Sequence, residues 1–124
     1  MKLILTILTV LLLPAISYAQ QNPQATSSMK FGWDQDISAD EDVTALTFKY
    51  YADDSSVGVP FTGVVCGGTA PTVSCSVPIP AFTPGVHSIR ISASNIAGES
   101  ALSVPFGFAL VVTPAAPRSI RLVK

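Results

Sequence analysis

The sequence has few of the residues that build active sites and nucleic-acid surfaces. It contains one histidine and 12% charged residues, with a formal net charge of −1 at pH 7. No cluster of lysine and arginine is available for phosphate contacts, so we expect no nucleic-acid partner. Phosphate loops, nucleotide fingerprints and glycosylation sequons are also absent. A hydrolytic site needs a nucleophile with a positioned base, paired carboxylates or metal ligands. We therefore expect no enzyme, no catalytic residue, no cofactor and no metal.

Long apolar runs are scarce beyond the amino-terminal end. Residues 3–13 form one, after Lys2, and a breaker and small residues follow at the spacing of a signal-peptidase site: Pro14, Ser17 and Ala19. The pattern predicts a secretory signal peptide over residues 1–19. A membrane span is the alternative, but it needs ~20 apolar residues. We expect a secreted protein, periplasmic or extracellular, that begins near Gln20 and keeps no membrane anchor.

Cysteine is limited to Cys66 and Cys75, which enclose the segment GGTAPTVS. Two glycines and a proline in that segment predict a hairpin turn between short strands. In an exported protein, an isolated pair so placed predicts a disulfide. A metal or redox pair would need CxxC spacing or a nearby histidine ligand, and neither is present.

Leucine is also scarce after residue 19, where only four occur: Leu46, Leu102, Leu110 and Leu122. Valine, isoleucine, phenylalanine, threonine and serine dominate instead, which is the composition of β-strands. The remaining length suits one small domain. Residues 20–28 carry a proline and no apolar side chain larger than Ala25, so we expect a flexible lead-in where no strand begins.

From residue 29 onward, apolar and polar residues alternate in the period of half-buried strands. We predict strands over residues 29–33, 43–51, 61–66, 73–80, 86–94 and 101–112, the last with a kink near Pro105 and Gly107. The inward faces would include Met29, Phe106 and Val112, and the core would be shared by Trp33, Phe48, Ile89, Ile91 and Phe108. Ser92 and its polar neighbours would face solvent.

The segment FTPGVHSIRISASNIAGES, residues 82–100, resembles the F strand and FG loop of a fibronectin type III domain. The run DVTALTFKYY, residues 42–51, is similar to the C strand of that family. The resemblance implies an all-β, Greek-key β-sandwich of about seven strands over residues 29–113, with strand A absent from its usual place. It also puts His87 where the family has a tyrosine that hydrogen-bonds backbone at a corner.

The carboxyl-terminal residues 114–124 form a proline-rich linker followed by alternation, which is similar to the opening of such a domain. We predict that 118–124 form a strand in the vacant strand A position, with Ile120 and Leu122 buried and Arg121 and Val123 outward. Residues 113–117 reach at most ~16 Å, which favours a neighbouring subunit over a return along the same domain. A linker left by a shortened domain array is the alternative.

The sequence thus favours a secreted structural or adhesive module that self-assembles into a homo-oligomer or filament. The alternative is a solitary domain that binds a polysaccharide or surface protein through two loops, with candidate residues Asp34, Asp36, Asp40, Asp42, Asn95 and Glu99. The acidic loop within residues 34–42 also raises the question of calcium, although it lacks the DxDxDG spacing of a known calcium loop.

Overall fold

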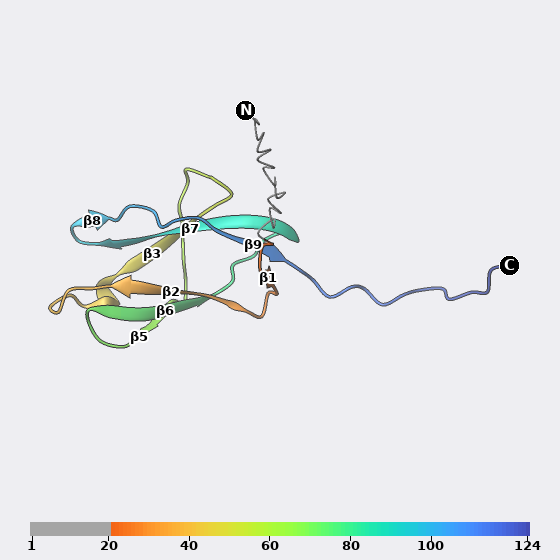
Figure 1. Cartoon of the computed structure of the whole chain (residues 1–124), viewed down its shortest axis with the longest axis horizontal. Helices are drawn as coiled ribbons and strands as arrows, with labels where there is room; N and C mark the ends of the chain where they lie inside the picture. The colour runs from red at the N-terminus through yellow and green to blue at the C-terminus, as the bar shows by residue number, and fades with distance from the viewer. Residues whose placement is uncertain (1–20) are drawn as a thin grey trace, which may run out of the picture.

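The computed structural model describes residues 21–124, which form two β-sheets (Figure 1). The predicted signal peptide lies outside the described residues. The larger sheet has the order β1-β9-β7-β3-β4, with β8 paired to β7, and the smaller has the order β2-β6-β5. The strands are β1 (Gln24–Ala25), β2 (Lys30–Asp36), β3 (Thr47–Ala52), β4 (Val59–Pro60), β5 (Val65–Gly67), β6 (Thr72–Pro78), β7 (Gly85–Asn95), β8 (Gly98–Glu99) and β9 (Phe106–Leu110). A single 3-10 turn, η1 (Val43–Ala45), precedes β3.

The two sheets share one interior. Phe31 and Val77 of the smaller sheet pack with Ile89 and Phe108 of the larger one, and the ring centroids of Phe31 and Phe108 lie 5.1 Å apart. Alternate residues of each strand supply these side chains, as the pleat requires. The arrangement confirms the all-β prediction and is compatible with a β-sandwich.

The predicted core is correct for its most buried members. Ile89 and Phe108 are buried in one cluster, whereas Phe48 is buried in a second cluster with Val73 and Cys75. Trp33 and Ile91 are only partly buried and pack against both clusters. The prediction that the polar face of β7 is solvated is wrong at Ser92, which is 1% exposed. Its hydroxyl donates a hydrogen bond to Glu99, so a side chain from the next strand covers it.

The prediction that no strand begins within residues 20–28 is wrong. Gln24 and Ala25 form β1, which pairs in parallel with β9. The N–H of Ala109 donates to Pro23 O at 2.9 Å, and the N–H of Val111 donates to Ala25 O at 2.8 Å. Ala25 is buried. The edge of β9 needs hydrogen-bond partners, and a small side chain fits beside it. A two-residue strand has no periodicity that a sequence pattern can reveal.

The last strand is shorter than predicted, because β9 begins only at Phe106. Pro105 has no N–H to donate to a ladder. In the segment before Pro105, Ser103 makes two hydrogen bonds to the backbone of Ile91 in place of regular strand pairing. Its N–H donates to Ile91 O, and its Oγ accepts from Ile91 N–H, both at 2.9 Å. Three residues that were predicted to face inward remain more than 45% exposed: Met29, Phe106 and Val112. Phe106 nevertheless lies on the same face of β9 as the buried Phe108 and packs edge-on against Phe31.

Candidate functional site: an open strand edge, a free tail and an acidic pole

The sheets have two distinct poles. Asp36 at the end of β2 and Asn95 at the end of β7 mark one, which we call the acidic pole because it carries Asp34, Asp36, Asp40, Glu41 and Asp42. Lys30 starts β2 at the other end, which we call the tail pole. β9 ends there, and the carboxyl-terminal residues leave the sheets from that end (Figure 1).

Strand β2 has one free edge in the described part of the chain, since it pairs only with β6. Bonds that flank this ladder join Ile79 N–H to Met29 O and Ile37 N–H to Pro71 O. Hydrogen-bonded and non-hydrogen-bonded pairs alternate in an antiparallel ladder. The odd-numbered residues of β2 therefore bond to β6. The backbone groups of Lys30, Gly32 and Asp34 face the free edge.

An apolar groove of about 340 Å³ lies beside this edge. Its walls come from both sheets and include Phe31, Trp33, Ile89, Ile91, Phe106 and Phe108. Residues of β1 and its turn, Pro23 to Ala25 and Met29, line the groove as well. The indole Nε1 of Trp33 is buried and has no hydrogen-bond partner within residues 21–124. A buried polar atom without a hydrogen-bond partner is unusual, because buried polar groups are nearly always satisfied.

The tail, residues 113–124, pairs with no strand of the described chain. Figure 1 shows it running away from both sheets. Ile120 and Leu122 are 94% and 102% exposed, and Arg121 and Val123 are exposed too. The predicted assembly residues thus stand free in the single subunit.

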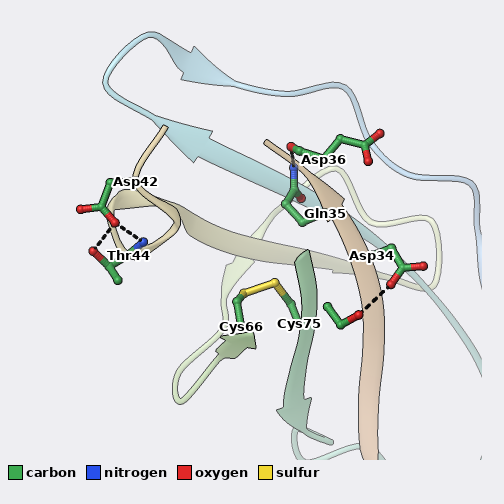
Figure 2. Close-up of a disulfide and its surroundings, with 8 residues drawn as sticks. Asp34, Gln35, Asp36, Asp42, Thr44, Cys66 and Cys75 are labelled. Atoms are coloured by element: carbon green, nitrogen blue, oxygen red, sulfur yellow. Dashed lines mark hydrogen bonds between the residues drawn. A yellow bond between two sulfur atoms is a disulfide. The ribbon is translucent and has the colours of Figure 1, made fainter. Parts of the chain in front are cut away.

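The acidic candidates are engaged mainly with their own chain (Figure 2). Asp34 accepts a hydrogen bond from Ser74 Oγ at 3.1 Å, and Asp36 accepts one from Thr72 Oγ1 at 2.8 Å. Asp42 caps η1 by accepting from the N–H of Thr44, and hydrogen bonds from both the hydroxyl and the N–H of Thr44 lower the pKa of Asp42. Asp40 is exposed. Within residues 21–124, no three carboxylate, histidine or cysteine groups gather as metal ligands would.

The other two loop candidates, Asn95 and Glu99, make different contacts. Asn95 joins the two loops by donating to Glu41 Oε1 at 3.2 Å, and its own Oδ1 accepts from Ala97 N–H. Glu99 lines the same hollow as Glu41 and Asn95 but hydrogen-bonds to other residues. Its Oε1 accepts hydrogen bonds from Ser92 Oγ and from Tyr51 OH, the latter at 2.6 Å. Both bonds lower the pKa of Glu99. The bond to Glu99 raises the pKa of Tyr51. Glu41, which the sequence did not single out, is the residue that links the loops.

Cys66 and Cys75 form the predicted disulfide (Figure 2). They sit directly opposite each other in the β5–β6 ladder, with Cα atoms 4.0 Å apart. The hairpin predicted for the segment between them is confirmed by this pairing.

We expect the double variant Cys66→Ala/Cys75→Ala to lose roughly 2–3 kcal/mol of unfolding free energy, because the bridge closes a short loop in the unfolded chain. Urea denaturation measures the loss, and the wild type under reducing conditions is the matched control. Equal stability of the oxidised wild type and the double variant would show that the bridge does not stabilise the fold.

His87 makes a contact that the sequence did not reveal. Its Nδ1 lies 2.8 Å from Asp53 Oδ2, and its Nε2 lies 2.7 Å from Thr83 O. Both ring nitrogens face acceptors, which suits the doubly protonated ring. The hydrogen bond to Asp53 raises the pKa of His87, and the same bond lowers the pKa of Asp53. The bond to Thr83 O is of the backbone kind expected at this corner.

This pair predicts a stability maximum at mildly acidic pH. The contribution of His87 is complete below its ordinary pKa of 6.5 and is lost as pH rises through the raised value. That of Asp53 is complete above 3.8 and is lost as pH falls through the lowered value. Thermal unfolding between these limits and at pH 8 should show the decline in the wild type. Asp53→Asn should flatten it, whereas Asp54→Asn, at an exposed neighbour, should leave it unchanged.

Comparison of the chain with protein-family models, with curated proteins and with solved structures finds no match. Residues 21–124 contain no helix of the length and apolarity that crossing a membrane requires. Together with the disulfide, this is compatible with a secreted protein. The fold and site define a two-sheet, disulfide-bonded β protein with an apolar groove beside β2.

Proposed function

We propose that this chain is a secreted, non-enzymatic structural or adhesive module that assembles by donating its tail to a neighbouring copy. The observation that carries the proposal is a mismatch within one chain. An apolar tail has no strand to pair with, while a strand edge and an apolar groove have no strand to cover them. Exposed strand edges readily accept strands from other chains.

The fibronectin type III resemblance supports this proposal. Strands β3, β7 and β9 pair in the order of that family's C, F and G strands, and β2 pairs with β6 as its B strand does with E. In this interpretation β1 covers only the end of β9, so the position of strand A beside β2 is left free. A donated strand completes the smaller sheet.

Donation of this kind is directional. The donor surface is the tail and the acceptor surface is β2, so each subunit uses two different patches. Interfaces between unlike patches build rings when the rotation closes and filaments when it does not. We expect an open filament, because the tail extends away from the sheets.

The second candidate function is a solitary binding domain for a polysaccharide or surface protein. The contact between Glu41 and Asn95 favours it, since it holds the two loops together beside a hollow of about 290 Å³. Against it, several of the proposed contact groups already have internal partners: Asp36, Asp42 and Glu99.

Size-exclusion chromatography and electron microscopy of the purified mature protein separate the two functions. A self-assembling module elutes early at high concentration and forms elongated particles. A solitary binding domain elutes at the mass of one subunit at every concentration and shows none.

A further inference from the structure

We propose that the donated tail lies antiparallel to β2, entering at the acidic pole, with Leu122 beside Phe31 and Ile120 beside Trp33. The inference rests on the proposed function and adds the direction and register of the contact. It follows from the shape of the groove, from the free edge of β2 and from the position of β1.

The register follows from the faces of the two strands. Phe31 and Trp33 point into the groove, and the residues between and beside them point outward. Residues two apart on the tail share a face as well, so Ile120 and Leu122 enter the groove together. Placing them opposite the two aromatic residues puts Arg121 opposite Gly32, Ser119 opposite Asp34 and Val123 opposite Lys30.

The direction follows from the shape of the groove. Pro23, Ala25 and Met29 line it at the tail pole, where β1 is hydrogen-bonded to β9. A strand that enters from the tail pole would have to pass these residues. At the acidic pole no strand of the described chain lies beside β2. The donated strand therefore begins there and stops against β1.

Charge favours association of the tail with the acidic pole. The tail carries Arg118, Arg121 and Lys124 and no acidic residue. The acidic pole offers five carboxylates on β2 and the loop after it. Opposite charges between the tail and this pole accelerate association, an effect that salt weakens.

This arrangement has a consequence for the shape of the assembly. A strand antiparallel to β2 runs in the same direction as β9 of the acceptor. The tail also continues the direction of its own β9, so successive subunits point the same way along a straight axis. If the tail instead folded back onto its own chain, it would run parallel to β2. The proline-containing linker and the extended course of the tail oppose that reversal.

Paired cysteines on the outward face test the register in the full chain. In the antiparallel arrangement, Asp34→Cys/Ser119→Cys and Lys30→Cys/Val123→Cys each bring two thiols into direct opposition, within the roughly 4.4–6.8 Å between Cα atoms that a disulfide needs. In the parallel arrangement, the matching pairs are Lys30→Cys/Ser119→Cys and Asp34→Cys/Val123→Cys. Mass spectrometry verifies that the native disulfide is retained, and non-reducing electrophoresis measures the products.

We expect ladders of covalent multimers from the two antiparallel pairs only, and their loss when Leu122→Asp is added. Ladders from the parallel pairs would overturn the direction while leaving strand donation intact. A monomer in which the two new cysteines form an intramolecular disulfide would mean that the tail occupies the groove of its own chain, which overturns donation between subunits. A protein that stays monomeric with free thiols in all four variants would overturn the proposed function itself.

Discussion

The variant Leu122→Asp is expected to stay monomeric at concentrations where the wild type assembles. Burying a leucine side chain contributes about 1.5–3 kcal/mol, and an unpaired carboxylate in an apolar groove costs further free energy. The dissociation constant of the tail from β2 should therefore rise by at least about 100-fold. Sedimentation velocity over a concentration series measures it.

The matched control is Val123→Asp, which adds the same charge one residue further on. Val123 faces outward in the donated strand, so this variant should assemble nearly as the wild type does. Both variants should unfold at the same denaturant concentration as monomeric wild type, because both side chains are exposed in the single subunit. A free peptide of residues 113–124 should stabilise the Leu122→Asp protein. Equal assembly of the two variants would contradict strand donation.

The second large effect is expected in the shared core. Ile89 is 2% exposed and packs between the sheets, so Ile89→Ala should cost on the order of 2–5 kcal/mol of unfolding free energy. Arg90→Ala should cost little, since the Arg90 side chain points outward and approaches Asp54 only at 4.0 Å. Denaturant unfolding of both variants gives the comparison, and similar losses would mean that the faces of β7 are assigned wrongly.

Ile91→Ala offers a related test, because its side chain is partly buried and lines the groove. The loss should be smaller than for Ile89→Ala in the monomer. It should grow under assembling conditions, where the donated tail covers Ile91. An equal loss in both states would indicate that the groove remains open.

Long alternation made the central strands predictable. β7 begins at the glycine of a Pro-Gly turn and keeps apolar residues on one face for most of its length. Its existence and its inward residues Ile89 and Ile91 were therefore evident from the sequence. The disulfide followed from an isolated pair around a turn. Two assignments depended on contacts with other strands and failed: Ser92 is buried under Glu99 of β8, and Ala25 is held by β9.

Only part of the candidate site could be predicted from the sequence. Alternation in residues 118–124 identified the tail, and the resemblance to a fibronectin type III domain predicted a vacant strand A position. The way β1 closes one end of the groove depends on parallel pairing with Ala109 and Leu110, which no local pattern encodes. The pairing of His87 with Asp53 depends on the register of separate strands in the same way.

Residue-resolved amide hydrogen exchange on β2 tests the central claim most directly. In the assembled wild type, the amides of Gly32 and Asp34 should exchange slowly, because the donated tail accepts their hydrogen bonds. In Leu122→Asp they should exchange as exposed amides do, while the amides of Phe31 and Trp33, bonded to β6, stay protected in both proteins. Equally fast exchange of Gly32 and Asp34 in the assembled wild type and in the variant would contradict the account, because β2 would then have a free edge even in the assembly.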